Sequence, residues 1–226
     1  MGITALANSN TDAKPVAHDG CWSPAGKQKK NKALILQAYQ ERVSLRGLAR
    51  LFHVARQQVA VWIREHTQAL PPLQSSLLPW QPDDVLEGDE AWSFVRTKLN
   101  KVWLWTVMCR RTRQIVAFAL GDRSDKTCQR LWNRIPWPYR HCLTYTDFWE
   151  SWQNVVPDTQ HVPSGKERGE TNHMERWYNT LRQRLSRFVR KTLSFSKSEA
   201  FHHMVVKWFI TEYNLHILHF WSALTL

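Results

Sequence analysis

Hydrophobic and polar residues recur with a helical period over residues 171–191 (TNHMERWYNTLRQRLSRFVRK), and this pattern predicts an amphipathic helix. One polar stripe consists of Asn172, Glu175, Asn179, Arg182 and Ser186. A separate apolar stripe consists of Met174, Tyr178, Leu181, Leu185 and Val189, with Trp177 and Phe188 beside it. A carboxylate on a basic helix that faces a polyanion would repel it unless a cation lay between them. The pattern therefore makes Glu175 a candidate metal ligand.

A helical pattern also covers residues 27–70, and residues 44–63 within it predict a helix, a tight turn and a second helix. Ser44 is a suitable N-cap. His53 falls at the turn, where histidine tolerates the left-handed conformation better than most residues. The pattern is typical of a helix-turn-helix DNA-binding domain, with a generic helical hairpin as the alternative. The start of the recognition helix would carry Arg56, Gln57 and Gln58.

The remaining segments predict an α+β protein with a mixed sheet. Residues 1–26 are polar and poorly patterned, which indicates a flexible arm, and the prolines of residues 71–84 predict an extended linker. Strands are expected at 85–95, 101–109, 113–120 and 141–146, a small strand near 160–162, and a last helix over about 198–220. Short links favour antiparallel pairing of the first three strands. This succession predicts a ribonuclease-H-like catalytic domain over residues 85–226.

Composition narrows the class of partner. The 226 residues include 31 Lys and Arg against 19 Asp and Glu, a net charge of +12, which favours double-stranded DNA. No apolar run is long enough to cross a bilayer, and the N-terminus does not resemble a signal peptide, so we expect a cytoplasmic protein. Four scattered cysteines favour free, buried thiols over a zinc site, and the histidines near the C-terminus favour a packed or solvated face.

Three carboxylates fall at positions that suit phosphoryl transfer. Asp89 lies in the first strand of the predicted sheet, Asp147 ends the fourth, and Glu175 follows on the helix. Two-metal chemistry needs such carboxylates at one end of a sheet. Each residue also has an ordinary explanation: Asp89 could lie with Glu87 and Glu90 on an exposed edge strand, Asp147 could cap a helix, and Glu175 could pair with an arginine. Their order and the basic chain favour a site for two Mg²⁺ or Mn²⁺ ions.

The same region resembles transposases of the insertion-sequence-1 family. The motifs that carry the resemblance are residues 86–95 (LEGDEAWSFV), 101–105 (KVWLW), 118–124 (FALGDRS), 145–149 (YTDFW), 170–176 (ETNHMER), 179–185 (NTLRQRL) and 190–197 (RKTLSFSK). The resemblance implies a prokaryotic, nucleoid-associated DDE transposase that nicks the ends of an element and joins the 3′ ends to target DNA. It implies that Asp89, Asp147 and Glu175 form the metal-binding triad and that Arg182 is the basic residue two helical turns further on.

Further expectations concern DNA contacts and assembly. Candidate DNA-binding residues of this half are His161, Lys166, Asn172, Asn179, Arg184, Arg187, Arg190 and Lys191, with a solvated basic face as the alternative for the last four. We expect a homodimer or higher oligomer on DNA. Only Cys21 lies where relatives carry a zinc-binding cluster, so no zinc finger is predicted. Gly88 is unusual inside a strand, and Arg96 stands where a turn-forming glycine is expected. The alternatives are a DNA-binding regulator with an inactive nuclease-like domain and a nuclease without strand transfer.

Overall fold

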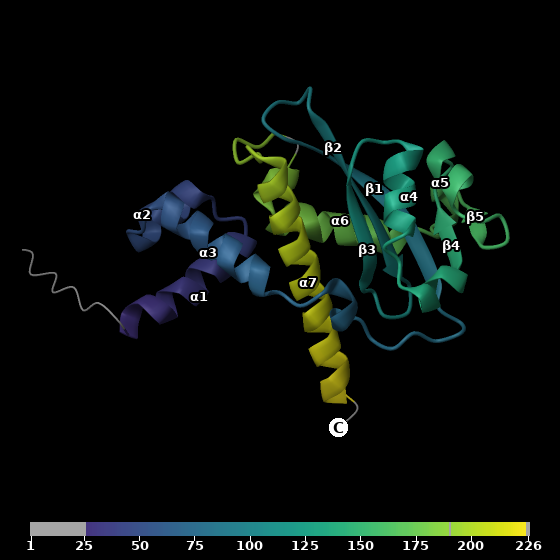
Figure 1. The fold of residues 1–226 in the computed structure, drawn as a ribbon, viewed down its shortest axis with the longest axis horizontal. Coiled ribbons are helices and arrows are strands. Elements are labelled where there is room, and N and C mark those ends of the chain that lie inside the picture. The colour runs from purple at the N-terminus through teal and green to yellow at the C-terminus, as the bar shows by residue number, and fades with distance from the viewer. Residues whose placement is uncertain (1–25, 190, 225–226) are drawn as a thin grey trace, which may run out of the picture.

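The computed structural model describes residues 26–189 and 191–224. Nearly all of the expected N-terminal arm, and with it Cys21, lies outside the described residues, as does Arg190. The described chain begins with three helices, continues into a mixed sheet flanked by helices and ends in a long helix (Figure 1). These elements fit the predicted α+β class.

A mixed, five-stranded sheet with the order β3-β2-β1-β4-β5 forms the centre of the protein. Its strands are β1 (Val85–Phe94), β2 (Lys101–Cys109), β3 (Ile115–Gly121), β4 (Leu143–Thr146) and β5 (His161–Pro163). β1 pairs antiparallel with β2 and parallel with β4, so it is the central strand. The strands match those that the sequence predicts. The alternative that Asp89 belongs to an exposed edge strand is wrong, because β1 has a partner on each side.

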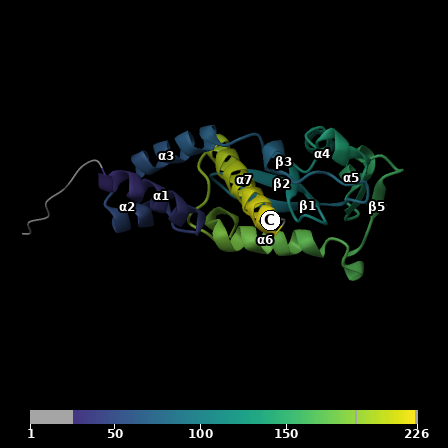
Figure 2. The ribbon, with the colours of Figure 1, turned by 90° about the horizontal axis from the view of Figure 1, so that it is seen from below.

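The two faces of the sheet pack against different helices, and each face has its own hydrophobic core (Figures 1 and 2). Helices α6 (Asn172–Arg184) and α7 (Glu199–Leu224) cover one face, where Ala91, Leu104 and Met108 are buried. Helices α4 (Asp125–Trp132) and α5 (Glu150–Val155) cover the other, where Trp105 and Val107 are buried. Alternate residues of β1 therefore face the two helical layers.

Helix α6 follows the predicted stripes over most of its length but is shorter than the sequence pattern suggests. Met174, Trp177, Tyr178 and Leu181 are buried, and Glu175 is exposed. The α-helix ends at Arg184, and a 3-10 turn follows over Ser186–Phe188. The expectation of one continuous helix to Lys191 is therefore wrong.

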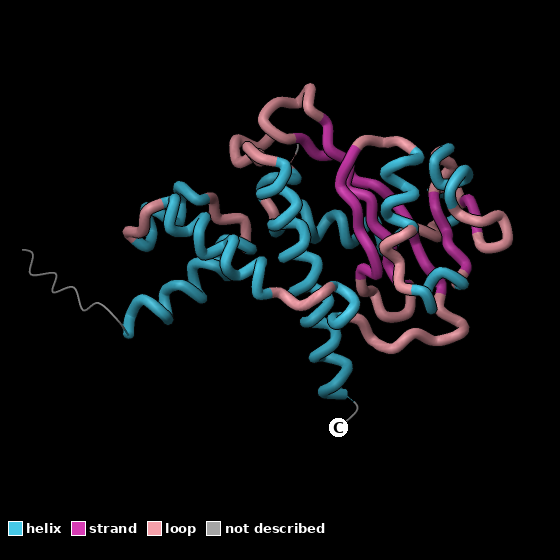
Figure 3. Tube along the Cα trace, in the orientation of Figure 1, coloured by secondary structure: helices cyan, strands magenta, loops and turns pink. Residues whose placement is uncertain are grey.

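The N-terminal helices are α1 (Gly26–Gln40), α2 (Leu45–Phe52) and α3 (Arg56–Ala69), and they lie on the far side of α7 from the sheet in Figure 3. Ser44 caps α2, with its Oγ accepting a hydrogen bond of 3.0 Å from Gly47 N. His53 ends α2 in the left-handed conformation, at φ 52°. Both local predictions are confirmed. Leu48, Val59 and Ile63 join the same hydrophobic core as α6 and α7, so the helices dock firmly on the rest of the chain.

The proline-rich segment that the sequence predicts as a linker is anchored by several hydrogen bonds. It contains a 3-10 helix, η1 (Leu73–Ser76). The side-chain amide of Asn214 on α7 donates to Ser76 Oγ at 3.2 Å, and that of Gln114 donates to Ser76 O at 2.7 Å. Just before β1, the buried carboxylate of Asp84 accepts hydrogen bonds from Arg111 at 2.6 and 2.9 Å. These contacts hold the segment against the sheet domain.

Within the described part of the chain, no helix combines the length and the apolar character that crossing a membrane requires. Cys109, Cys128 and Cys142 are free and buried, as the sequence predicts for them.

Candidate active site

The parallel pairing of β1 with β4 brings two of the predicted carboxylates together. Glu87 is in register with Tyr145, the last pair of this ladder. Two residues further along each strand are Asp89 and Asp147, at the point where β4 ends and the chain turns away. Carboxylate oxygens of Asp89, Glu90 and Asp147 lie within 4.8 Å of one another. The sheet itself therefore gathers three acidic side chains at the end of β4.

Asp89 is the most perturbed carboxyl of this cluster. Its side chain is half-buried, and its Oδ1 accepts a hydrogen bond of 2.7 Å from Glu90 N. Burial, followed by the charges of Glu90, Asp147 and Glu175, raises the pKa of Asp89 to about 7. A group of anions crowded in this way is stabilised by a cation, because the cation relieves both the desolvation and the mutual repulsion.

Asp147 combines a local and a distant contact. Its Oδ1 accepts a hydrogen bond of 3.1 Å from Trp149 N, which closes the turn leading into α5. Its Oδ2 lies 3.9 Å from a guanidinium nitrogen of Arg123. The capping interpretation is thus supported for one oxygen of Asp147, while the other lies near Arg123.

Glu90 belongs to the cluster although the sequence analysis did not select it. Its side chain is almost fully buried and is paired with Arg123, whose Nε donates to Glu90 Oε1 at 2.6 Å. The indole of Trp152 donates to Glu90 Oε2 at 3.1 Å. Arg123 is held in turn over the ring of Trp149, at 3.6 Å from its centroid. Burial and the charge of Asp147 raise the pKa of Glu90, while Arg123 opposes this.

Glu87 connects the strand that carries Asp89 to the helix that carries Glu175. Its carboxylate is fully buried and accepts hydrogen bonds from His173 Nδ1 at 2.6 Å and from Arg110 Nε at 2.8 Å. Met174 N approaches Glu87 Oε2 at 3.4 Å. Burial raises the pKa of Glu87, and Arg110 opposes the rise. The first turn of α6 is thereby attached directly to β1.

Glu175 points from the exposed side of α6 and forms no ion pair with any described residue. The alternative of a helical pair with Arg176 or Arg182 is therefore not seen. Glu175 is not within the 4.8 Å cluster, but its charge contributes to the raised pKa of Asp89. The helix is fixed beside the strand by Tyr178, whose hydroxyl donates to Asp89 O at 2.7 Å.

Arg182 lies two turns after Glu175, half-buried, with its guanidinium carbon 5.9 Å from the Tyr178 ring centroid. Its Nη1 donates a long hydrogen bond of 3.5 Å to Asn179 Oδ1. Asn172 and Asn179 are exposed on the same helix. These side chains remain accessible beside the carboxylates.

Two unusual residues of the first strand have structural explanations. A Cβ added to Gly88 would lie 2.9 Å from Trp152 Cη2 and 3.2 Å from Thr146 Cγ2. Gly88 is thus needed for the close approach of α5 to β1 and does not loosen the strand. Arg96 does adopt the left-handed conformation, at φ 64°, where a glycine is expected. Its backbone N donates to Ser196 O at 2.7 Å and its Nε to Lys197 O at 3.1 Å, which holds the turn.

The basic track expected after Glu175 is not a continuous exposed surface. Arg187 is buried, donating to Ser196 Oγ at 2.7 Å and to the Tyr39 hydroxyl. Arg184 is paired with Glu41, directly after α1, at 2.7 Å. Both arginines therefore connect parts of the fold, and the expectation that they contact DNA is wrong for the buried Arg187. Lys191 is exposed.

The other DNA-binding candidates lie in different places. Arg56, Gln57 and Gln58 are exposed at the start of α3. His161 is half-buried and forms a hydrogen bond of 2.8 Å with Thr146 Oγ1. The side chain of Lys166 lies outside the described residues.

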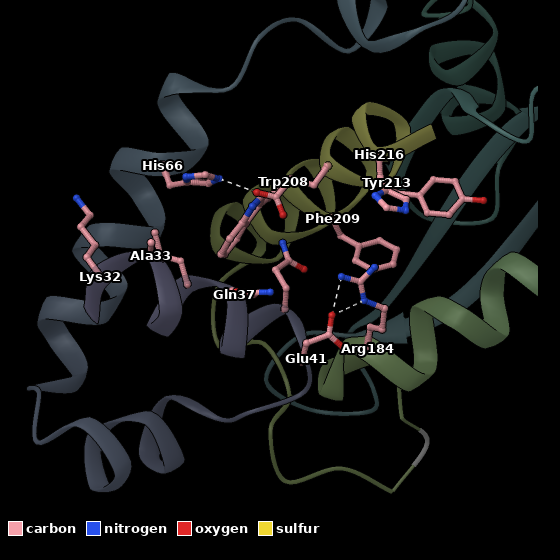
Figure 4. A pocket seen from close by; sticks show the side chains of 13 residues that line it. Lys32, Ala33, Gln37, Glu41, His66, Arg184, Trp208, Phe209, Tyr213 and His216 are labelled. Atoms are coloured by element: carbon pink, nitrogen blue, oxygen red, sulfur yellow. Dashed lines mark hydrogen bonds and ion pairs between the residues drawn. The ribbon is translucent and has the colours of Figure 1, made fainter. Parts of the chain in front are cut away.

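A cavity of about 730 Å³ lies between the N-terminal helices and α7, away from the carboxylates (Figure 4). Two contacts cross it, a hydrogen bond of 3.0 Å between His66 and Glu212 and the ion pair of Arg184 with Glu41. Aromatic side chains of α7, Trp208 and Phe209 among them, form part of its wall.

The region that contains these carboxylates is similar to known proteins. A family model described as IS1 transposase matches residues 85–216, from the first residue of β1 into α7. The chain belongs to the IS1 transposase family. The resemblance in the sequence motifs is thereby confirmed.

Curated relatives are similar over slightly more than half of the chain. The insertion element iso-IS1n protein InsB of Shigella dysenteriae is 36% identical over 129 residues, which cover 57% of this chain and 95% of the relative. The IS1 4 protein InsB of Escherichia coli K12 is 34% identical over 120 residues, covering 53% of this chain and 70% of that protein. The IS1 protein InsB of Shigella flexneri is also 34% identical over 120 residues, which cover 88% of its length.

Proposed function

We propose that this member of the IS1 transposase family binds the ends of an insertion element, nicks the DNA and joins the freed 3′ ends to a target. The observation that carries the proposal is that Asp89 and Asp147 lie together at the end of β4. The charge of Glu175 is close enough to contribute to the raised pKa of Asp89. The strand order, with β1 central and antiparallel to β2, supports a ribonuclease-H-like assignment of the sheet domain.

In this proposal Asp89, Asp147 and Glu175 hold two Mg²⁺ or Mn²⁺ ions. Carboxylate oxygens are the ligands that these hard cations prefer, and the crowded carboxylates fit a dication. When bound, such ions would supply Lewis-acid stabilisation of negative charge at the reacting phosphate and would activate water for nicking and the freed 3′-hydroxyl for joining. The protein's own contribution is positioning: Glu90 N fixes the Asp89 carboxylate, Trp149 N fixes that of Asp147, and Tyr178 fixes α6 against β1.

Arg182 is proposed to contact a phosphate of the bound strand. It lies on the same stripe of α6 as Glu175 and has no carboxylate partner among the described residues. A guanidinium there offers a bidentate donor to phosphate oxygens.

The N-terminal helices are proposed to act as a helix-turn-helix domain that recognises the element ends. Support comes from the capped α2, the left-handed turn at His53 and the exposed Arg56, Gln57 and Gln58 at the start of α3. Side chains at the start of a recognition helix are those that reach base edges in the major groove. Joining two ends requires two active sites, so we propose a homodimer or higher oligomer on DNA.

The proposal is tested with DNA that carries the inverted repeats flanking the gene, incubated with purified protein and Mg²⁺ or Mn²⁺. Wild type is expected to nick the ends and yield joined product, and Glu175→Gln is expected to lose at least about 100-fold in nicking rate. Glu199→Gln, the same change at an exposed site at the start of α7, is the control and should nick normally.

Three results would overturn parts of the proposal. Absence of nicking by wild type, with binding to the ends intact, would favour the alternative of a DNA-binding regulator whose nuclease-like domain is inactive. Equal nicking by Glu175→Gln and wild type would remove Glu175 from the site. Nicking without joined product would indicate a nuclease.

A further inference from the structure

A second pocket, of about 360 Å³, lies on a different side of α6 from the carboxylate stripe. It is lined by His173, Arg176 and Thr180 of α6, which are spaced so that they share one face of the helix. Arg113, directly after the β2–β3 turn, and Tyr213 of α7 form part of the opposite wall. Sequence patterns did not select this group because its members come from three separate elements.

Two charged side chains of this pocket have no ion-pair partner among the described residues. Arg113 and Arg176 are both exposed, and neither guanidinium forms an ion pair or hydrogen bond with a described residue. By contrast, the two other arginines of the same turn are neutralised, Arg110 by Glu87 and Arg111 by Asp84. Two unpaired guanidinium groups that line one concave surface repel each other unless an anion lies between them.

The floor of the pocket offers a further unused donor. Trp177 is 2% exposed and its indole N–H has no hydrogen-bond partner in the described structure. A buried N–H without a partner is uncommon in folded proteins and costs free energy. The ring is held by its neighbours, with its centroid 5.3 Å from that of Tyr178 and 6.1 Å from that of Tyr213. The Trp177 ring is therefore a fixed part of the wall of the pocket that Arg113 and Arg176 also line.

The backbone at Arg113 is fixed in an uncommon conformation. Arg113 adopts the left-handed conformation, at φ 63°, which non-glycine residues adopt rarely. Its backbone N donates to Cys109 O at 2.8 Å, which fixes the turn. The turn therefore fixes where the Arg113 side chain leaves the backbone at the wall of the pocket.

We infer that this pocket, with Arg113 and Arg176 as its charged walls, binds a backbone phosphate of duplex DNA. The inference rests on the proposed function, and it adds a contact site to the carboxylates. Because Arg176 directly follows Glu175 on α6, a DNA segment whose strand is cut at the carboxylates would cross the helix and present a neighbouring phosphate to the pocket. The site then sets the position of the DNA relative to the metal ligands, without reading its sequence.

The test compares duplex binding by wild type and by the double variant Arg113→Gln/Arg176→Gln, using fluorescence anisotropy over a range of salt concentrations without divalent metal. The double variant is expected to bind about 10-fold more weakly, and the slope of log K against log salt should fall by about 1 to 2, because one to two phosphate contacts are lost. Lys98→Gln/Lys101→Gln removes the same charge from exposed sites around the β1–β2 loop and should change binding less than about twofold.

Ethylation interference identifies the phosphate. Ethylation of one or two phosphates near the cut site should weaken binding by wild type but make no further difference to the double variant. An unchanged salt slope, or an equal loss in the lysine control, overturns the inference while leaving catalysis intact. Failure of wild type to bind duplex DNA overturns both the inference and the proposed function.

A second measurement compares the melting temperatures of wild type and the double variant with inorganic phosphate alone. If it raises the melting temperature of wild type but not of the double variant, and the two bind DNA equally, the pocket takes a free anion and the DNA inference is wrong. A melting temperature of the double variant within a few degrees of wild type shows that both proteins are folded.

Discussion

The metal-free protein is expected to lose stability as the pH rises from about 4 to about 7, and Asp89 is the main cause. Burial and three neighbouring carboxylates raise the pKa of Asp89 to about 7, whereas an unfolded aspartate has a pKa of about 3.9. Between these values the folded protein holds a proton that the unfolded chain has released. The free energy of unfolding therefore falls with rising pH in this window and is level above it.

The size of the effect follows from the same two pKa values. From pH 5 to pH 8 the folded form of Asp89 crosses about two pH units of this window, which at 1.36 kcal/mol per unit gives about 3 kcal/mol. The side chain is half-buried, and screening by solvent reduces this to about 1.5 kcal/mol. In a chain of this length that corresponds to about 3–6 °C in melting temperature.

Asp89→Asn isolates the effect, because asparagine does not titrate and its side-chain oxygen still accepts the hydrogen bond from Glu90 N. Melting temperatures of both proteins are measured at pH 5 and pH 8 in EDTA. The variant should gain 3–6 °C relative to wild type as the pH rises (about 1.5 kcal/mol). Glu87 and Glu90, whose pKa values are also raised by burial, are present in both proteins. Asp83→Asn, at an exposed position before β1, is the control.

A difference between wild type and Asp89→Asn that stays constant within about 1 °C from pH 5 to pH 8 would refute the reasoning. Magnesium supplies an independent check at pH 8. Because the ion binds only the charged carboxylates of the folded protein, it should raise the melting temperature of wild type more than that of Asp89→Asn.

Two further predictions concern the packing around β1. Gly88→Ala places a methyl group 2.9 Å from Trp152 Cη2 and is expected to lower the free energy of unfolding by about 1–3 kcal/mol; a urea titration measures this, and unchanged stability would show that α5 can move away from the strand. Glu87→Gln leaves Arg110 without its buried partner and should lower the free energy of unfolding by about 3–5 kcal/mol. Nicking should be lost as well, because α6 is no longer held against β1 by Glu87. Full nicking by this variant would mean that Glu87 does not position Glu175.

Sequence patterns predicted the local structure well. Ser44 and His53 were identified from their positions at the ends of a helix, and the buried residues of α6 from a period of 3.6. Such features depend on residues close in the sequence. The same reasoning failed at Arg187, which the helical pattern placed on an exposed face. The α-helix ends at Arg184, and Arg187 reaches Tyr39 in α1 instead, a contact between residues far apart in the chain.

The candidate site was only partly predictable, because several of its contacts join residues far apart in the chain. Asp89 and Asp147 follow from the succession of strands, because parallel β1 and β4 bring matching positions together. Glu90 was considered only as part of an exposed edge, since its partners Arg123 and Trp152 lie 33 and 62 residues further along the chain. Three acidic residues within four positions of an apolar strand were the available signal. Such a run in a buried strand requires distant cations to balance it.

Successive side chains of β1 face opposite sides of the sheet, so the function of this strand depends on its length as much as on its composition. Glu87 and Asp89 face α6, while Gly88 and Glu90 face the α4–α5 layer. Inserting or deleting one codon here would turn each side chain to the opposite layer. Glu87 would lose the first turn of α6, and a side chain larger than glycine would meet Trp152. Among copies of the element, we therefore expect substitutions to accumulate in β1 while its length stays fixed, with changes in length confined to segments such as the exposed loop at residues 96–100.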